Sequence, residues 1–306
     1  MKIQRRTFVS SPALALAASG AEPPQAAPDP TLRVAACQIL TFPDTRRSAA
    51  KIREWIRKAA QERVDAVVFP EAATCGYTCD ADYWKNAKAG DFAAAEAEII
   101  AAAREHHIAV ITGTAHWEEG RIFNSLLVID KGGHVRGRYS KTFLAEKWPT
   151  PGRTLPVWEV CGVKSCFIIC HDIRYPELVR LPAIAGAQIC YYASNESGLV
   201  LEHKLSAYRA MPIARATENS IYLVMANAPA DSENMNSPSQ SHGNSKIIHP
   251  NGNVLAEAGY FQETLVTATI ELKHADRAIA RRAAAEGSEV SRWLREGARL
   301  VRGDGS

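Results

Sequence analysis

Residues 65–71 read Asp-Ala-Val-Val-Phe-Pro-Glu, and residues 165–171 read Ser-Cys-Phe-Ile-Ile-Cys-His. Each stretch contains a short apolar run followed by a residue that can carry chemistry, the carboxylate of Glu71 or the thiol of Cys170. Continuous apolar runs of this length are typical of strands buried on both faces. Pro70 favours a strand end, because proline cannot donate to a sheet ladder. Both stretches therefore predict buried strands with a reactive side chain at their ends.

The chain around these runs alternates strands with amphipathic helices. A strand is expected at Leu32–Leu40, and Asp44 or Thr45 can cap the next helix, whose residues Ile52, Trp55, Ile56, Ala59 and Ala60 share one face. Further helices are expected near residues 92–106, 175–186 and 203–218. Further strands are expected near residues 108–112, 124–129, 134–139, 188–193, 221–226, 245–248, 253–257 and 264–272.

This order predicts an α/β protein with mixed sheets covered by helices. Residues 31–274 show no internal repeat and no interior linker, so we expect a single domain there. The extension at 275–306 is predicted to be helical from 275 to 301. Its apolar stripe (Val290, Trp293, Leu294, Ala298 and Val301) is more typical of packing than of chemistry.

Composition excludes some classes of function. The chain has 306 residues, 46% of them hydrophobic, and 36 basic against 33 acidic residues give a net charge of +3. With no long run of one charge, nucleic acid is not an expected partner. The seven cysteines are odd in number, so at least one thiol is unpaired unless it bonds another chain.

Residues 1–30 have the layout of a secretory signal peptide, with a basic start, a weakly apolar stretch and a Pro/Ala-rich end. Gln4-Arg5-Arg6-Thr7-Phe8 resembles a twin-arginine signal, and small-residue cleavage sites follow at Ala13–Ala15 and Ala15–Ala17. We expect export to the periplasm and removal of this segment. The alternative is a disordered N-terminus with a chance Arg-Arg pair. No other segment reaches the roughly 18 apolar residues of a membrane span.

Three polar residues lie at strand ends: Glu71, Lys141 and Cys170. Singly, each has an ordinary explanation as a solvated carboxylate, a surface lysine or a buried thiol. Together they form a chemically sensible set, because a thiol nucleophile needs a base and its tetrahedral intermediate needs a positive group. We expect Cys170 to be buried in a narrow pocket.

His171 offers a rival arrangement, the Cys–His pair of thiol peptidases. Neighbours on an extended chain point to opposite faces, which argues against His171 as the base for Cys170. Its backbone N–H is better placed as an oxyanion donor.

Metal and disulfide patterns are weak. Cys75 and Cys79 could pair after export, but they fit loop and core thiols better, and no cysteine or histidine group has zinc spacing. We expect no cofactor.

From about residue 32 to 275 the chain resembles the nitrilase superfamily of carbon–nitrogen hydrolases. The resemblance rests on motifs in the expected order: Val68-Phe69-Pro70-Glu71 with Gly76-Tyr77, Phe123-Asn124-Ser125 through Tyr139-Ser140-Lys141, Ile169 to Leu178, Arg215 to Asn219, Ala226-Asn227, and Gly243-Asn244-Ser245 before Pro250-Asn251-Gly252. It implies an αββα sandwich that pairs into homodimers or larger homo-oligomers.

The resemblance also implies roles. Glu71 would be general base and acid, Lys141 would stabilise the tetrahedral intermediate, and Cys170 would form a thioester. Glu146 is the acidic residue placed to be the second glutamate of many members. No metal or organic cofactor is implied. His171-Asp172 after the cysteine favours a small amide or N-carbamoyl substrate over a nitrile, although the same triad could hydrolyse nitriles.

Substrate contacts are expected from Tyr77, Asn195 and Glu196, the last two in a loop that could also be a plain connection. If Glu196 lines the pocket, a cationic substrate group becomes plausible. Two other classes stay open: a noncatalytic exported binding module of the same fold, and a cysteine peptidase that would need His203 or His242 close to Cys170. The acyltransferase branch requires membrane spans that the sequence lacks.

Overall fold

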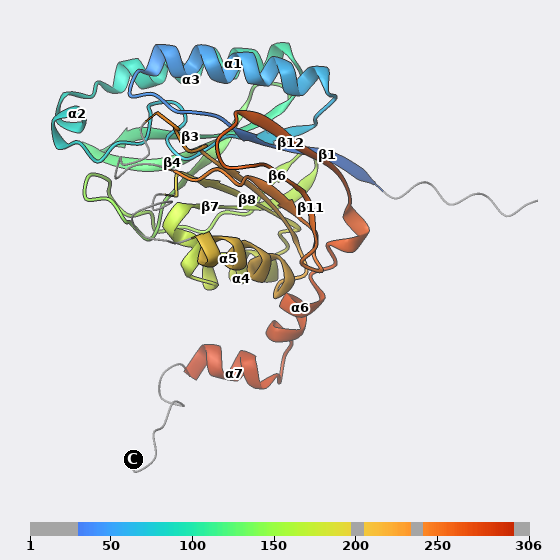
Figure 1. Ribbon diagram of the computed structural model, residues 1–306. Helices are drawn as coiled ribbons and strands as arrows, with labels where there is room; N and C mark the ends of the chain where they lie inside the picture. The colour runs from blue at the N-terminus through green and yellow to red at the C-terminus, as the bar shows by residue number, and fades with distance from the viewer. Residues whose placement is uncertain (1–29, 197–204, 234–240, 297–306) are drawn as a thin grey trace, which may run out of the picture.

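The computed structural model describes residues 30–196, 205–233 and 241–296 (Figure 1). Within them the chain forms four layers in the order helices, sheet, sheet, helices. This confirms the predicted αββα sandwich. Residues 1–29, on which the export prediction rests, lie outside the described residues. So do residues 297–306, and with them two members of the predicted C-terminal stripe.

The first sheet has the strand order β12-β1-β2-β3-β4-β5. Strands β1, β2 and β3 run parallel, and the other neighbours in the sheet are antiparallel. Consequently β2, β3 and β5 all end at the same edge. Their bounds are β1 Thr31–Gln38, β2 Ala66–Val68, β3 Ala109–Glu118, β4 Arg121–Ile129, β5 Val135–Ser140 and β12 Thr264–Glu271.

The second sheet has the order β11-β10-β9-β8-β7-β6, with a parallel centre of β7, β8 and β9. The carboxyl ends of these central strands face the site described below. The bounds are β6 Trp158–Val160, β7 Val163–Ile169, β8 Ile189–Ser194, β9 Tyr222–Asn227, β10 Lys246–Ile248 and β11 Val254–Glu257.

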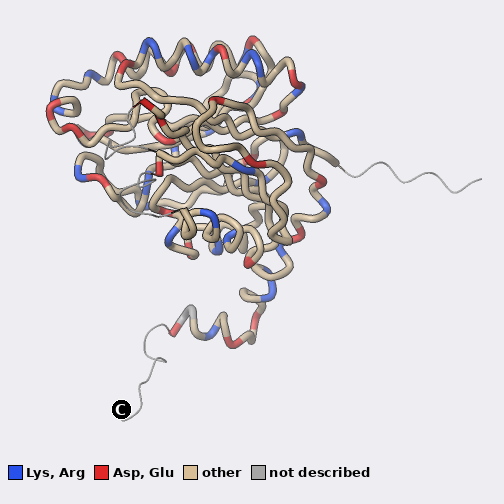
Figure 2. Tube along the Cα trace, in the orientation of Figure 1, with Lys and Arg blue, Asp and Glu red and all other residues tan. Residues whose placement is uncertain are grey.

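Three apolar layers hold the sandwich together. Between the sheets, Val68 and Ile111 of the first sheet pack with Ile169 and Val224 of the second. Helices α1 (Thr45–Gln61) and α3 (Ala89–Glu105) cover the first sheet, and α4 (Glu177–Ile184) and α5 (Leu205–Thr217) cover the second. The outer faces of α1 and α3 carry charges of both signs (Figure 2), as expected of solvated helix faces.

Local signals explain the boundaries. The Asp44 side chain accepts a hydrogen bond from the N–H of Arg47, so the predicted cap of α1 is confirmed. Ile52 and Ile56 are fully buried on the predicted apolar face. Removing either side chain leaves a cavity against the sheet, which typically costs about 2–5 kcal/mol for Ile→Ala.

The structure differs from the sequence prediction in four places. Strand β3 continues to Glu118 and forms a long hairpin with β4 through Glu119 and Gly120, both at positive φ. The short helix α2 (Ala81–Asn86) and strand β6 were not predicted. The C-terminal stretch is helical, as predicted, but the helix expected over 275–301 is interrupted in its described part. A short 3-10 turn (Leu272–His274) precedes two separate helices, α6 (Ala278–Ala284) and α7 (Glu289–Glu296), which Gly287 at φ +77° helps to divide.

None of the helices in the described ranges combines the length and the apolarity that crossing a bilayer requires.

Candidate active site

Glu71 is fixed by the close approach of two strands. It follows β2 directly, and its backbone N–H donates to the Ser194 carbonyl of the other sheet at 3.3 Å. On β3, a Cβ built at Gly113 would lie 2.3 Å from the carbonyl oxygen of Pro70 and 2.3 Å from the amide nitrogen of Ala72. Only glycine lets the backbones approach this closely. The carboxylate is therefore held from both sides of its chain.

Lys141 joins Glu71 to Glu146. Its ammonium donates to Oε1 of Glu71 at 2.8 Å and to Oε1 of Glu146 at 2.6 Å, and all three side chains are shielded from solvent. Asn124 of β4 donates its Nδ2 to the same Glu71 oxygen at 2.8 Å. The lysine directly follows β5, and its N–H donates to the Asn124 carbonyl at 2.8 Å.

Burial sets the charges of this group. It raises the pKa of Glu71 to about 7, against the Lys141 ammonium, which lowers it. For Lys141 burial favours the neutral amine, but its acidic neighbours Cys170, Glu71 and Glu146 raise its pKa overall. For Glu146 burial favours the acid, and the lysine charge lowers the pKa overall. The lysine is thus a fixed cation, while Glu71 can exchange a proton near neutral pH.

Cys170 lies at a strained turn. It follows β7, has φ +45° and begins the 3-10 helix Cys170–Arg174. Left-handed backbone is costly for a residue with a side chain and is common where a reactive group must be exposed to a site. Its residue is only 6% exposed, so the expected burial is confirmed.

Asp172 connects this turn to the segment that follows Lys141. Its carboxylate accepts from the Ile169 N–H at 3.1 Å, from the Tyr139 hydroxyl at 2.7 Å and from the Phe143 N–H at 2.8 Å. These bonds connect the end of β7 in the second sheet to the end of β5 in the first. From the sequence, Asp172 served only to favour an amide over a nitrile substrate, and its role in holding the turn was not predicted, although a carboxylate inside a buried turn must find donors.

A second carboxyl meets the thiol. The Cys170 Sγ lies 3.4 Å from Oε1 of Glu196, which follows β8 and is 3% exposed. The Tyr192 hydroxyl donates to the same oxygen at 3.2 Å. Burial raises the pKa of Glu196 to about 7. Burial, followed by the charges of Glu196 and Glu71, raises the pKa of Cys170.

His171 shows that one premise of the sequence argument was wrong. The chain from Cys170 to His171 is a 3-10 turn and is not extended, so alternation of faces does not apply. The His171 ring lies against Tyr175, with ring centroids 5.9 Å apart. The charges that act on the thiol are those of Glu196, Glu71, Lys141 and Glu146.

The other expected site residues also converge here. The Tyr77 hydroxyl donates to Oε1 of Glu146 at 3.0 Å, and the Asn195 backbone N–H donates to Oε2 of Glu71 at 3.1 Å. Asn124 and Asn227 were not predicted as site residues. Asn227 Oδ1 accepts from the Glu196 N–H at 2.9 Å. Their signal was a polar residue within or ending an apolar buried strand, which must be hydrogen-bonded.

Neither candidate histidine of a cysteine peptidase, His203 or His242, is seen in contact with Cys170 among the described residues. His203 lies outside the described residues. The imidazole of His242 lies 3.4 Å from the amide of Asn227 and against the Tyr208 ring, and burial lowers its pKa to about 4. All seven cysteines are free thiols, with Cys75 buried and Cys79 exposed. Over the described ranges, His, Cys, Asp and Glu side chains form no group of three suited to a metal ion.

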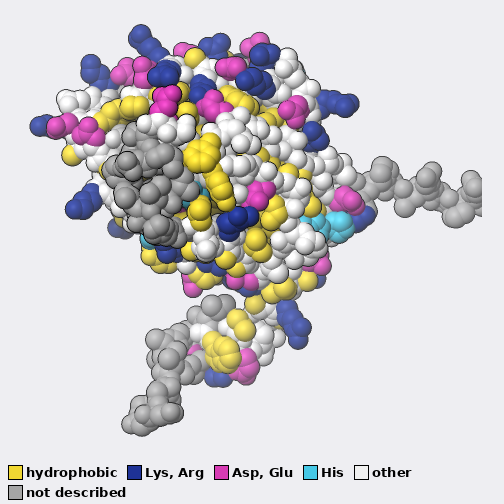
Figure 3. Space-filling model, in the orientation of Figure 1, with side chains coloured by type: hydrophobic (Ala, Val, Ile, Leu, Met, Phe, Trp, Pro, Cys, Tyr) yellow, Lys and Arg dark blue, Asp and Glu magenta, His cyan; other side chains and the backbone are white. Residues whose placement is uncertain are grey.

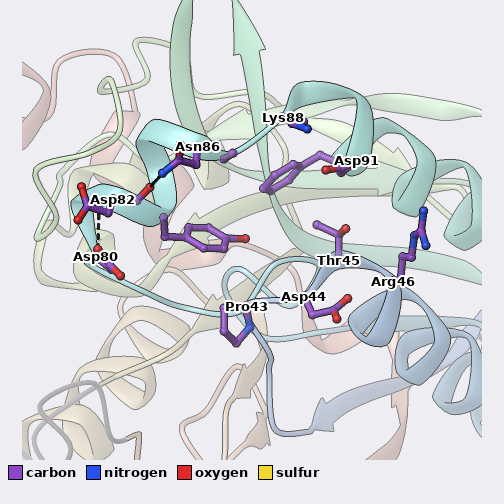
Figure 4. A pocket seen from close by; sticks show the side chains of 12 residues that line it. Pro43, Asp44, Thr45, Arg46, Asp80, Asp82, Asn86, Lys88 and Asp91 are labelled. Atoms are coloured by element: carbon purple, nitrogen blue, oxygen red, sulfur yellow. Dashed lines mark hydrogen bonds between the residues drawn. The ribbon is translucent and has the colours of Figure 1, made fainter.

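A surface pocket of about 640 Å³ beside α2 is a different place (Figure 4). Its acidic residues are used in local structure, since Asp80 caps α2 by accepting from the Asp82 N–H at 2.8 Å and Asp44 caps α1. Its lining contains neither Glu71 nor Lys141 nor Cys170. We therefore assign the chemistry to the buried cluster.

Fold and cluster together define a class: a four-layer αββα enzyme with a buried thiol among carboxyls and a lysine. The family model for carbon–nitrogen hydrolases matches residues 33–280, and the chain belongs to this family, within the nitrilase superfamily. It is therefore a carbon–nitrogen hydrolase that uses a cysteine nucleophile.

Relatives agree with this assignment. A protein described as a hydrolase in the agr operon of Staphylococcus lugdunensis is 30% identical over 68% of this chain and 88% of its own length. The 2-oxoglutaramate amidase of Bacillus subtilis is 28% identical over 73% and 84%. Among solved structures, the fold matches an amidase variant from Nesterenkonia sp. AN1 that carries the acetamide moiety of fluoroacetamide on its active-site cysteine. That match has a TM-score of 0.74 and 22% identity over 87% of this chain and 96% of that one.

Proposed function

We propose that this protein hydrolyses a small carboxamide or N-carbamoyl compound through a thioester on Cys170. The observation that carries the proposal is the shielded chain of hydrogen bonds from Glu71 through Lys141 to Glu146, at 2.8 and 2.6 Å, beside a buried thiol. Burying charged groups this deeply costs desolvation free energy, and such groups are concentrated at sites where their charge is used in function. Stabilising a developing oxyanion is such a function.

In the first half-reaction the Cys170 sulfur attacks the carbonyl carbon, and the thiol proton passes to a buried carboxyl. The Lys141 ammonium and the His171 backbone N–H stabilise the oxyanion. The nitrogen then leaves as ammonia or amine after it accepts a proton from Glu71, whose pKa of about 7 suits both halves of the reaction. In the second half, Glu71 takes a proton from water, and the hydroxide attacks the thioester.

Glu146 acts on the lysine in this scheme. It accepts from both Lys141 and the Tyr77 hydroxyl, so it holds the ammonium in place. Tyr77 and Asn195 are the candidate substrate contacts next to this group.

Amides are favoured over nitriles as substrates. The relatives include the 2-oxoglutaramate amidase of Bacillus subtilis and a chloroplastic omega-amidase of Arabidopsis thaliana, 28% and 26% identical to this chain. The turn after the nucleophile is built on His171-Asp172, and Asp172 supports it by accepting from the Ile169 N–H.

The test is release of ammonia from simple amides (acetamide, propionamide, glutaramate), from N-carbamoylglycine and from propionitrile, measured on purified protein. We expect ammonia release from the simple amides or from N-carbamoylglycine, and none from any compound with Cys170→Ser. Activity on the nitrile alone would contradict the substrate class. Silence with every compound would favour the binding module.

Export and self-association are further parts of the proposal. Export rests on Gln4-Arg5-Arg6-Thr7-Phe8, and we expect Arg5→Lys with Arg6→Lys to retain the protein in the cytoplasm on cell fractionation.

Association into a homodimer or larger homo-oligomer is supported by apolar side chains on the C-terminal helix α7, where Val290 and Trp293 are 41% and 52% exposed (Figure 3). Light scattering on purified protein tests it, and a monomer would contradict it.

A further inference from the structure

Glu196 is the carboxyl in direct hydrogen-bond contact with the nucleophile. Its Oε1 lies 3.4 Å from the Cys170 Sγ, within the range of a hydrogen bond to sulfur. The two residues follow neighbouring parallel strands, β7 and β8, in which Ile169 pairs with Ala193. Sheet register therefore brings the segments that carry the two residues side by side.

Hydrogen bonds fix Glu196 at its carboxyl and at its backbone. The Tyr192 hydroxyl lies 3.2 Å from Glu196 Oε1 and 3.2 Å from the Cys170 carbonyl oxygen, so it holds acid and nucleophile at once. On α5, Tyr208 also donates to Glu196. The Glu196 N–H donates to Asn227 at 2.9 Å. An acceptor held this way can take a proton with little reorganisation.

Glu71 has different partners. Its Oε1 accepts from Lys141 and Asn124, both at 2.8 Å, and its Oε2 accepts from the Asn195 N–H at 3.1 Å. Each carboxyl therefore has its own set of donors, and among these contacts it is Glu196 that receives the thiol.

These contacts argue against Glu196 as a site for a cationic substrate group. Its carboxyl already has donors from Cys170, Tyr192 and Tyr208. Behind Tyr208, the Arg174 guanidinium donates to the phenol oxygen at 2.9 Å and supplies a positive charge.

Building on the proposed function, we propose that Glu196 accepts the Cys170 thiol proton when the sulfur attacks and returns it when the thioester is cleaved. Glu71 then exchanges protons only with the leaving nitrogen and with the attacking water. Before acylation Glu196 is a carboxylate and Glu71 is a carboxylic acid. Forming the S–C bond moves the thiol proton to Glu196, and breaking the C–N bond moves the Glu71 proton to nitrogen. In deacylation water gives one proton to Glu71, and the departing thiolate recovers its proton from Glu196. The starting state is restored.

The surroundings of Glu196 suit a reversible acceptor. Burial raises its pKa to about 7, so that carboxylate and acid are both accessible near neutral pH. The ionisable groups that face it are Cys170, Tyr192, Tyr208, Glu71, Lys141 and, through Tyr208, Arg174.

Alkylation of Cys170 by iodoacetamide separates the two carboxyls. In this reaction the S–C bond forms, iodide leaves with the electron pair of the C–I bond, and the thiol loses its proton. No leaving group needs protonation, so Glu71 donates no proton in this reaction. We expect Glu196→Gln to slow alkylation of Cys170 at pH 7.5 by about 100-fold, and Glu71→Gln to change it by no more than about threefold.

Peptide mass mapping isolates the Cys170 signal, and Cys170→Ala gives the background from other thiols. Unchanged alkylation in Glu196→Gln, or equal slowing in both variants, would overturn the proposal. Neither result touches amide hydrolysis by the wild type, which the ammonia assay tests separately.

Tyr192→Phe keeps the carboxyl and removes one of its donors. Losing a hydrogen bond to the charged form raises the pKa of Glu196, so the pH at which alkylation reaches half its plateau should move upward from the wild-type value. A purely structural role would lower the rate at every pH without moving that midpoint, and an unmoved midpoint would contradict the proposal.

Discussion

The two sheets contribute chemically different halves of the site. The first sheet brings the Lys141 ammonium, whose nitrogen lies 2.8 Å from a carboxyl oxygen of Glu71 and 2.6 Å from one of Glu146. The second brings Cys170, Glu196 and Tyr192, a group joined by hydrogen bonds from a thiol and a hydroxyl. The first half is built to stabilise charge, and the second half is built to release a proton.

Bonds between the sheets keep these halves in register. The Glu71 N–H donates to the Ser194 carbonyl at 3.3 Å, and the Tyr139 hydroxyl donates to Asp172 at 2.7 Å. Away from the site, an apolar core packs between the two sheets. The comparison teaches that neither sheet contains the site alone, so changes that alter one half should leave a distinct signature.

The largest effect is expected from removing the nucleophile. Cys170→Ala should lower turnover by roughly 10⁴-fold or more, because no other group forms the covalent intermediate. Cys161→Ala is the matched control, since Cys161 lies in the turn between β6 and β7 and its thiol contacts the Asp65 carbonyl. Steady-state ammonia release measures the turnover of both variants. Substantial turnover in Cys170→Ala would contradict the role of Cys170 as the nucleophile.

Lys141→Met should break the first half while leaving the second intact. Without its cation the oxyanion loses a stabilising charge, and kcat/KM should fall by about 10³-fold. Two buried carboxyls also lose their cation, which typically costs about 3–5 kcal/mol of unfolding free energy. Urea denaturation measures the second effect, and a fully stable variant would contradict the assignment of Lys141 as the buried counter-ion.

Gly113→Ala should loosen Glu71 without touching a charged group. The new Cβ would meet backbone atoms at 2.3 Å, so β2 or β3 must shift, and we expect a loss of about 3 kcal/mol together with lower kcat. Gly90→Ala is the control, because Gly90 lies in α3 with open space at that position and alanine is the better helix former by about 1 kcal/mol. Thermal unfolding should move in opposite directions for the two variants, and equal shifts would count against the close approach at Glu71.

The pH dependence should be the gentlest test. Burial raises the pKa of Glu71 and of Glu196 to about 7. Glu71 must start as the acid, so activity is lost as pH rises above this value, and Glu196 must start as the carboxylate, so activity is lost as pH falls below it. A plot of kcat/KM should peak near neutrality and fall by about tenfold per unit on each side. A flat profile between pH 5 and 9 would show that these carboxyls do not exchange protons in the reaction.

Much of the scaffold could be predicted from local patterns. The helix with Ile52 and Ile56 on one face, its cap at Asp44 and the buried strands that precede Glu71 and Cys170 follow from periodicity and capping, which act within a few residues. The long hairpin of β3 and β4 was missed because the predicted strand stopped at Thr112, before Gly113, and a glycine weakens a strand pattern.

The inner contacts of the site could not be predicted in the same way. The left-handed turn at Cys170 depends on Asp172 finding donors in two strands, one from each sheet. The contact between Glu196 and the thiol depends on the register of β7 against β8. Such contacts come from chain segments far apart in sequence, and only packing brings them together.

Mass spectrometry of the trapped intermediate tests the central claim most directly. Protein mixed with an amide that it hydrolyses, quenched in acid within the first turnover and digested, should carry the acyl group on the peptide that contains Cys170, in step with the first equivalent of ammonia released. Ammonia released without any acyl adduct, or an adduct on another residue, would contradict a thioester at Cys170.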